Sequence, residues 1–144
     1  MATITTPVLL DAYTAKQCPM RVHNDFSPSV PTAPWQPSPE DQSRLDAGIT
    51  FEAEVFAMLT AAVGGAVVTD PNLRKAEAIA ATMHHMSNGA PIILGGWLPD
   101  DYIGGRKGRP DLLIRAGEGY VPGDVKKHST VGARKATTAL VSPL

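Results

Sequence analysis

The sequence predicts an α/β domain in which helices pack on a small mixed sheet. The chain has 144 residues, of which 43% are apolar and 19% are charged, and these values suit one globular domain with its own core. Two long segments with helical signals come first, and three strand-like runs separated by glycines follow them. We therefore expect helices followed by a β-meander.

The chain divides into three parts that together form one domain. Residues 1–27 form an N-terminal helical segment, in which LLDAYTAKQC predicts a short helix that ends before Pro19. Residues 28–39 contain five prolines, which exclude helix and favour an extended strap over the surface. Residues 40–144 hold the main α/β core.

The core begins with two helices. Ser38 can cap a helix whose first position is Pro39, so we predict a helix from about Pro39 to Val63 that is stopped by two glycines. The short run AVVT after it predicts a strand. Asp70-Pro71 is a second start signal, and NLRKAEAIAATMHHMS predicts a helix closed by Asn88-Gly89.

The strand-like runs are PIILGGWL, RPDLLIR and YVPGDVKK, and the last two predict a hairpin. Gly117-Glu118 fits a two-residue type II′ turn, which pairs residues whose numbers sum to 235. In this register Asp111 lies opposite Asp124, and Arg109 lies opposite Lys126, all on one face. The other face is expected to be the core face and carries Leu112, Ile114, Val121 and Val125.

One acidic residue interrupts the apolar face of the first long helix. The stripe at helical spacing comprises Leu45, Ile49, Glu52, Phe56, Leu59 and Val63, whereas Glu54 points away. A carboxylate that faces a core needs a partner. For Glu52 this is either an arginine or a backbone amide at the edge of the core, or a bound cation.

The predicted hairpin places two carboxylates directly opposite each other, where like charges repel. A divalent cation would relieve the repulsion between Asp111 and Asp124, since magnesium prefers carboxylate oxygens. Lys126 lies on the same side, where it could orient a water molecule or neutralise a phosphate. The alternative is an ordinary Asp/Lys ladder on a solvated sheet face.

The same residues carry a family resemblance. Pro110-Asp111, followed by Asp124-Val125-Lys126, resembles the PD-(D/E)XK nuclease signature. The run Gly48-Ile49-Thr50-Phe51-Glu52 looks like the first motif of RecB-like nucleases, with Glu52 where many members have histidine. Cys18-Pro19-Met20-Arg21 is similar to the N-terminal segment of their iron-sulfur members, and the stretch from Gly89 to Ile93 looks most like the actinobacterial RecB-like type.

This resemblance implies a restriction-endonuclease-like core and a nuclease domain that hydrolyses DNA phosphodiesters. Its metal ligands would be Glu52, Asp111, Asp124 and the backbone carbonyl of Val125, holding Mg²⁺ or Mn²⁺, and Lys126 would position or activate the water. Such proteins often carry a helicase region further along, so a fused or associated helicase is an expected partner. The rival hypothesis is a non-catalytic nuclease-like module that binds DNA or a partner protein.

The chain departs from the family pattern in two ways. Cys18 is its single cysteine, so an iron-sulfur cluster within this chain is excluded, and we expect Cys18 to be a small buried apolar residue. The family core continues after the DXK strand with a helix and a strand that HSTVGARKATTALVSPL does not resemble. We therefore expect an N-terminal piece of a longer protein, with an exposed sheet edge that favours self-association or a disordered tail after about Thr130.

The charge distribution suits a polyanionic partner. Residues 1–103 hold 5 basic and 11 acidic residues, whereas residues 104–144 hold 8 basic and 3 acidic residues. The tryptophans Trp35 and Trp97 are expected to be packing residues. Contacts to the DNA backbone are expected from Arg106, Lys107, Arg109, Lys127 and His128, with Arg134 and Lys135 as further candidates.

No apolar run is long enough to span a membrane, and the N-terminus does not resemble a signal peptide. The sequence therefore predicts a cytoplasmic protein without a membrane partner.

Overall fold

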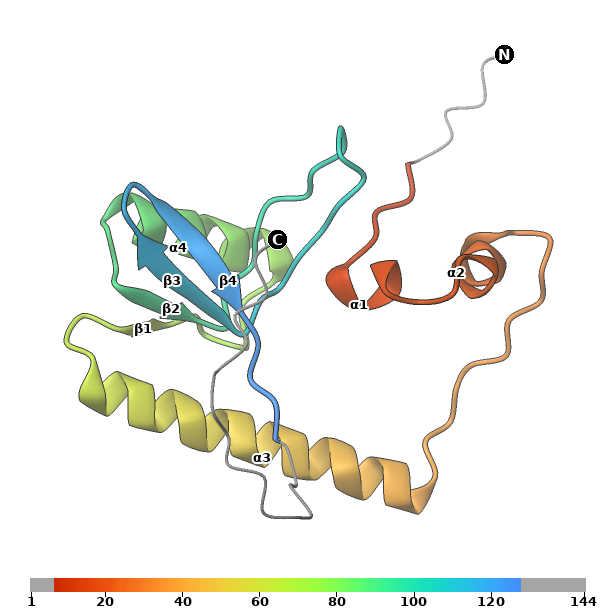
Figure 1. The fold of residues 1–144 in the computed structure, drawn as a ribbon, viewed down its shortest axis with the longest axis horizontal. Coiled ribbons are helices and arrows are strands. Elements are labelled where there is room, and N and C mark those ends of the chain that lie inside the picture. Colours follow the sequence, from red (N-terminus) through yellow and green to blue (C-terminus); the bar gives the residue numbers. More distant parts are fainter. Residues whose placement is uncertain (1–6, 128–144) are drawn as a thin grey trace, which may run out of the picture.

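The computed structural model describes residues 7–127, which fold into helices and one four-stranded sheet (Figure 1). In chain order the elements are α1 (Ala12–Ala15), α2 (Pro19–Phe26), α3 (Pro39–Ala62), β1 (Val67–Val68), α4 (Lys75–Ser87), β2 (Ile92–Leu94), β3 (Leu112–Ala116) and β4 (Gly119–Gly123).

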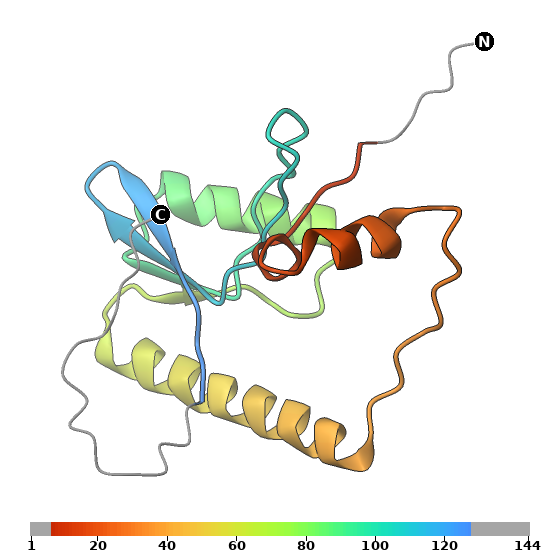
Figure 2. The same ribbon diagram turned by 45° about the vertical axis from the view of Figure 1, so that its right-hand side comes forward.

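The sheet is mixed, with the strand order β1-β2-β3-β4. β1 and β2 are parallel and are joined through α4, whereas β2, β3 and β4 form an antiparallel meander. Figure 2 shows α4 on one side of the sheet and α3 on the other. The α/β class, the strand in AVVT and the meander are thus confirmed.

The core lies between the sheet and α4. Ile93 and Leu113 are almost completely buried there together with Ala90, and Met86 and Tyr120 pack against them. The Tyr120 hydroxyl donates to the carbonyl of Ala90 at 2.7 Å, which ties β4 to the loop after α4. This small core fixes the three antiparallel strands that lead into the candidate site.

Helix α3 has the predicted ends. The Ser38 hydroxyl accepts a hydrogen bond from the Asp41 N–H at 3.1 Å, and the Asp41 carboxylate accepts the Ser38 N–H at 3.2 Å, which forms a capping box. The expected apolar stripe is wrong over the first half of the helix, where Leu45 is exposed and Ile49 is 67% exposed. The reason is that α3 packs against β1, and its Phe56 side chain lies beside Gly95.

The hairpin has the predicted register. Ala116 pairs with Gly119 and Leu112 with Gly123, and Gly117 takes a positive φ of 61° in the turn. The predicted core face is wrong for this part of the sheet, because Ile114 and Val121 are 42% and 46% exposed whereas Leu113 is buried. Helix α4 covers the face that carries Leu113, since the Leu113 and Thr82 side chains meet at Gly96.

Helix α4 starts later than predicted. The Asp70 carboxylate accepts the N–H of Asn72 at 2.9 Å, so Asp70 closes a local turn and does not cap the helix. Glu77 receives the Arg74 N–H at 3.1 Å, and the helix begins at Lys75. Its end at Ser87, with Gly89 at φ 69°, is as predicted.

The N-terminal part contains two short helices where one was predicted. Asp11 caps α1 by accepting the Thr14 N–H at 2.7 Å, and Pro19 occupies the first turn of α2. Cys18 precedes α2 and is exposed, so the expectation that it is a buried apolar residue is wrong.

Residues 31–38 form an exposed, extended connection as predicted, and Trp35 on it is exposed and does not act as a packing residue. Within residues 7–127, no helix has both the length and the apolar character needed to cross a membrane.

Candidate functional site

Asp111 stands at the point where three chain segments meet. It directly precedes β3, and its backbone carbonyl accepts the N–H of Gly95, the residue after β2, at 2.8 Å. Its carboxylate Oδ2 accepts the N–H of Val125, which follows β4, at 2.7 Å. Asp111 is therefore held from both neighbouring segments, and its carboxylate has a fixed position.

Asp111 and Asp124 are the residues next after the last strand pair, Leu112 and Gly123, and their carboxyl groups interact with each other. Partial burial raises the pKa of Asp111; the Val125 N–H opposes this, and the neighbouring Asp124 and Glu52 carboxylates raise the pKa further. Burial also disfavours the charge on Asp124, but hydrogen bonding with Asp111 and the Lys126 ammonium holds the pKa of Asp124 below its usual value. The two aspartates thus form an interacting pair in which Asp111 is the readier to accept a proton.

Glu52, on α3, and Asp111 both line one groove on the surface. The groove has a volume of about 570 Å³ and runs between α3 and the segment after β4. Within residues 7–127, no three histidine, cysteine, aspartate or glutamate side chains form a group that could hold a metal ion by themselves. The acidic residues are therefore a close pair, Asp111 and Asp124, and a third carboxylate, Glu52, that repels Asp111 across the groove.

This donor set fits a hard divalent cation. Magnesium is commonly held by one or two carboxylates together with water and phosphate oxygens, so it does not need a cage of three protein carboxylates. The like-charged pair of Asp111 and Asp124 is the arrangement that a cation would stabilise.

Two lysines supply positive charge beside the pair. The Lys126 ammonium lies 3.1 Å from Asp124 Oδ1, and both side chains remain mostly exposed. Lys16, at the end of α1, also lowers the pKa of Asp124 through its charge. Lys126 was expected from the sequence but Lys16 was not, because no local sequence pattern connects α1 with the end of β4.

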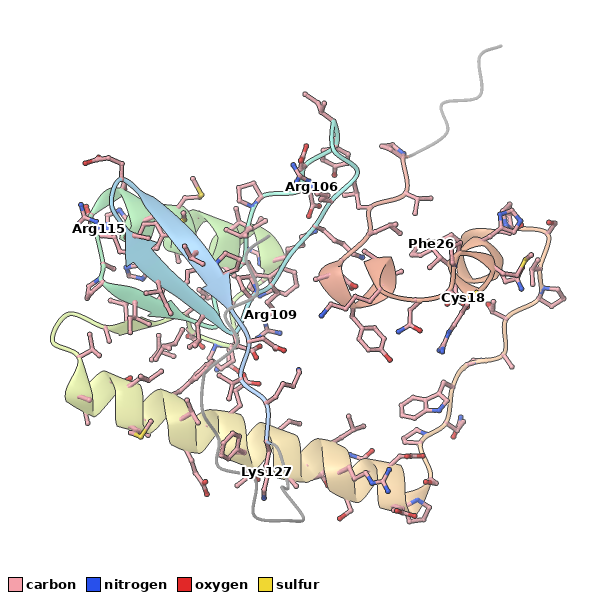
Figure 3. All side chains as sticks on the ribbon, in the orientation of Figure 1. Cys18, Phe26, Arg106, Arg109, Arg115 and Lys127 are labelled. Atoms are coloured by element: carbon pink, nitrogen blue, oxygen red, sulfur yellow. The ribbon has the colours of Figure 1, made fainter. Side chains whose placement is uncertain are left out.

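The predicted DNA-contacting residues occupy different surroundings. Arg106 forms an ion pair with Asp101 at 2.7 Å, and Arg109 lies over the Trp97 ring at 5.2 Å from its centroid. Lys127 lines the groove between α3 and the segment after β4, together with Glu52 and Asp111, and the Lys107 backbone is hydrogen-bonded to Leu10. Figure 3 shows that these residues are far apart. Arg106 lies on the loop between β2 and β3, Arg109 lies near the end of the sheet, and Lys127 lies beside α3. His128, Arg134 and Lys135 lie outside the described residues.

Trp97 has surroundings that the sequence did not indicate. Lys75 lies 5.8 Å from its ring centroid and forms an ion pair with Asp100 at 2.6 Å. Together with Arg109, Lys75 therefore contributes a second cation beside this tryptophan. This cluster could not be predicted from a local pattern, because Lys75 and Arg109 come from segments on either side of β2.

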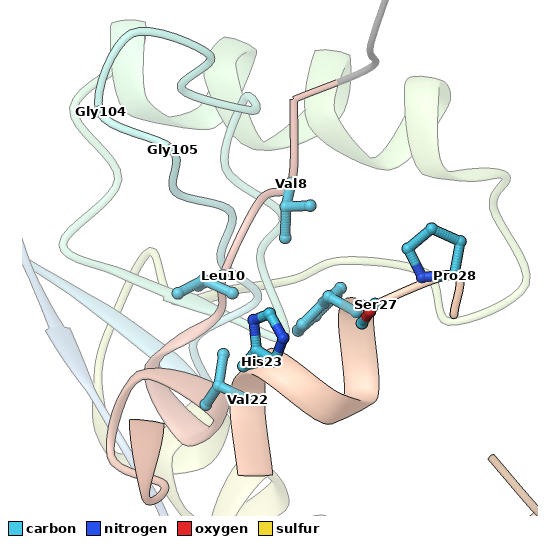
Figure 4. A pocket seen from close by; sticks show the side chains of 9 residues that line it. Val8, Leu10, Val22, His23, Ser27, Pro28, Gly104 and Gly105 are labelled. Atoms are coloured by element: carbon cyan, nitrogen blue, oxygen red, sulfur yellow. The ribbon is translucent and has the colours of Figure 1, made fainter. Parts of the chain in front are cut away.

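A second groove of about 600 Å³ lies away from the acidic pair and has mainly apolar walls (Figure 4). It is lined by Val8, Leu10, Val22, His23, Phe26, Ser27, Pro28, Gly104 and Gly105. Val22 and Phe26, one turn apart on α2, are a weak helical signal that sequence analysis passed over.

Comparison of the chain with protein-family models, with curated proteins and with solved structures found no match.

Proposed function

We propose that this chain is a metal-dependent DNA nuclease domain of the PD-(D/E)XK, RecB-like kind, part of a longer DNA-processing protein. The observation that carries the proposal is the end of the hairpin, where Asp111 and Asp124 lie next to each other and the Lys126 ammonium lies beside Asp124. Stable folding alone does not favour two adjacent carboxylates at a sheet end. Glu52 in the same groove adds the third acidic residue of the resemblance.

Asp111 and Asp124 would hold Mg²⁺ or Mn²⁺, with Glu52 and the Val125 carbonyl as further ligands from the groove walls. Such an ion lowers the pKa of bound water and stabilises charge on a phosphate. The chain itself positions the carboxylates, because the Val125 N–H donates a hydrogen bond to one oxygen of Asp111. The Lys126 ammonium beside Asp124 can donate a hydrogen bond to a water molecule or to a phosphate oxygen, and Lys127 and Arg109 can contact the DNA backbone.

The test is cleavage of labelled single-stranded and double-stranded DNA by the purified chain with Mg²⁺ or Mn²⁺. We expect metal-dependent cleavage that Asp124→Ala and Lys126→Met abolish. Glu54→Gln, which changes an exposed carboxylate on the same helix as Glu52, should leave cleavage unchanged. Cleavage that survives Asp124→Ala, or that needs no divalent ion, would contradict the assignment.

One observation favours the second candidate, a non-catalytic module that binds DNA or a protein. Lys126 is paired with Asp124, as in an ordinary Asp/Lys ladder. This candidate predicts DNA binding without cleavage, both by the chain and by a longer form of the protein. Binding that is unchanged by Asp124→Ala and independent of divalent ions would support it.

A further inference from the structure

The loop between β2 and β3 projects from the sheet (Figure 1). The turn between Asp101 and Arg106 in this loop carries two large apolar side chains, those of Tyr102 and Ile103. Ile103 is 102% exposed and Tyr102 is 60% exposed, so neither contributes much to the packing of the described chain. Single exposed apolar residues are common on protein surfaces, but two adjacent ones at the end of a projecting loop form a compact apolar point.

The loop beneath this tip is firmly built. The backbones of Asp101 and Arg106 exchange hydrogen bonds of 2.8 and 2.9 Å. The Asp101 carboxylate accepts the Gly104 N–H at 2.7 Å and two guanidinium N–H groups of Arg106 at 3.0 and 2.7 Å. Gly105 takes a φ of 65°, which closes the turn. These hydrogen bonds restrain the turn that carries the tip, which lowers the entropic cost of inserting it into a partner.

A second set of hydrogen bonds fixes the loop to the N-terminal segment. The Leu10 N–H donates to the Gly105 carbonyl at 2.9 Å, and the Lys107 N–H donates to the Leu10 carbonyl at 3.1 Å. The loop is thus held by hydrogen bonds within its turn and by the backbone of Leu10, while the Ile103 side chain stays fully exposed.

Basic residues follow the tip along the chain. Asp100 and Asp101 precede the tip and pair with Lys75 and Arg106, and the chain leaving the loop carries Arg106, Lys107 and Arg109 before it reaches Asp111 of the acidic pair. Arg106 remains largely exposed although it is paired with Asp101. An apolar point that is followed along the chain by three cations suits DNA, where cations contact phosphates and apolar side chains enter between bases.

We propose that Tyr102 and Ile103 insert into the base stack of DNA bound at the acidic site, where single strand meets duplex. This inference rests on the proposed function, because it takes DNA as the ligand. It adds a substrate preference: the loop holds bases apart while the basic residues after it direct the backbone toward Asp111 and Asp124. A junction is preferred because its terminal base pairs are the least costly to unstack.

The experiment uses the full chain without divalent ions and a forked DNA with 2-aminopurine at the junction, whose fluorescence rises when the base is unstacked. We expect a rise on binding, and we expect Ile103→Ser to remove the rise and weaken binding about ten-fold. Ile114→Ser is the matched control, since it removes another exposed isoleucine from the sheet face, and it should behave like the parent.

Three outcomes would overturn the inference: DNA binding by the parent without a fluorescence rise, an Ile103→Ser variant that equals the parent, or a parent that binds no DNA. Binding of the parent to phosphatidylglycerol vesicles that is lost in Ile103→Ser, with no change on DNA, would assign the tip to a lipid surface instead. Cleavage is measured separately with Mg²⁺ or Mn²⁺. A chain that cleaves DNA without unstacking it contradicts only this inference, and one that unstacks DNA without cleaving it contradicts only the nuclease proposal.

Discussion

Replacement of Asp111 by asparagine separates the structural role of this residue from its proposed role in binding metal. Asparagine keeps an oxygen that can accept the Val125 N–H, and its amide can donate to the Asp124 carboxylate. The substitution therefore retains the hydrogen bond and removes a like-charge repulsion. We expect the variant to be as stable as the parent without metal, or slightly more stable.

The magnitude is modest because the site is open to solvent. Asp124 is 60% exposed, so removing one charge from the pair should change the free energy of unfolding by about 1 kcal/mol at most. Asp111→Ala also removes the acceptor for the Val125 N–H and should lower stability by about 1 kcal/mol. A change of 1 kcal/mol corresponds to about 4 °C in Tm for a chain of this length.

The contribution of each aspartate to the stability of the fold depends on pH. Because the folded chain raises the pKa of Asp111 above its ordinary 3.8, Asp111 contributes stability in acid, and this contribution is lost as pH rises through the folded pKa. The pKa of Asp124 is lowered, so Asp124 contributes stability at neutral pH that is lost as pH falls. The advantage of Asp111→Asn over the parent should therefore grow between acid and neutral pH.

Manganese should have a larger effect. A hundred-fold excess over its dissociation constant would stabilise the parent by about 2.7 kcal/mol, or roughly 10 °C in Tm. Asp111→Asn should lose this shift, and Glu54→Gln, which changes an exposed carboxylate of α3, should keep it.

The assay is thermal unfolding followed by circular dichroism, with and without manganese. A parent with no shift at millimolar manganese would refute the metal site. Strong destabilisation of metal-free Asp111→Asn would also refute the reasoning, because it would mean that the Asp111 charge holds the fold together.

Three further predictions follow from the described contacts. DNA binding should weaken as salt rises, and Lys127→Ala should reduce the slope of log affinity against log salt by about one; binding that is insensitive to salt would contradict this. Ser38→Ala should lower the unfolding free energy by about 1 kcal/mol through loss of the α3 cap, measured by urea unfolding, and an unchanged midpoint would contradict it. Pro122→Val should increase self-association in sedimentation experiments. Pro122 lies opposite Leu113, at a position where a residue with an N–H would direct it outward from the β4 edge. A strictly monomeric variant would count against edge pairing.

The sequence predicted the parts of the fold that local chemistry determines. Ser38, Pro39 and the two glycines after Val63 bound α3 because capping and chain reversal depend on neighbouring residues alone. The hairpin register was predictable for the same reason, since a two-residue turn leaves little choice of pairing once Gly117 occupies it. This register also brought together the best-defined part of the candidate site.

The errors concern packing between distant segments. The alternation of residues in β3 is compatible with burial of either face, and only the position of α4 shows that Leu113 is buried while Ile114 is exposed. Likewise, the apolar residues of α3 have helical spacing along its whole length, but the sheet meets the helix at β1, so Ile49 stays exposed. Lys16 and Lys75 were missed because their neighbours at the site are remote in sequence.

Asp111 explains why the site lies at the end of the hairpin and not within it. Its carbonyl is hydrogen-bonded to Gly95, so β2 and the start of β3 remain paired. On the other side the Val125 N–H is taken by the carboxylate of Asp111 and not by a backbone carbonyl, which ends the regular β3–β4 ladder. The side chain of Asp111 thereby lies next to that of Asp124 and lines the groove that Glu52 also lines. Because Asp111 closes the ladder through its acceptor oxygen, a replacement that keeps the acceptor leaves this role intact, which is why asparagine, and not alanine, isolates its charge.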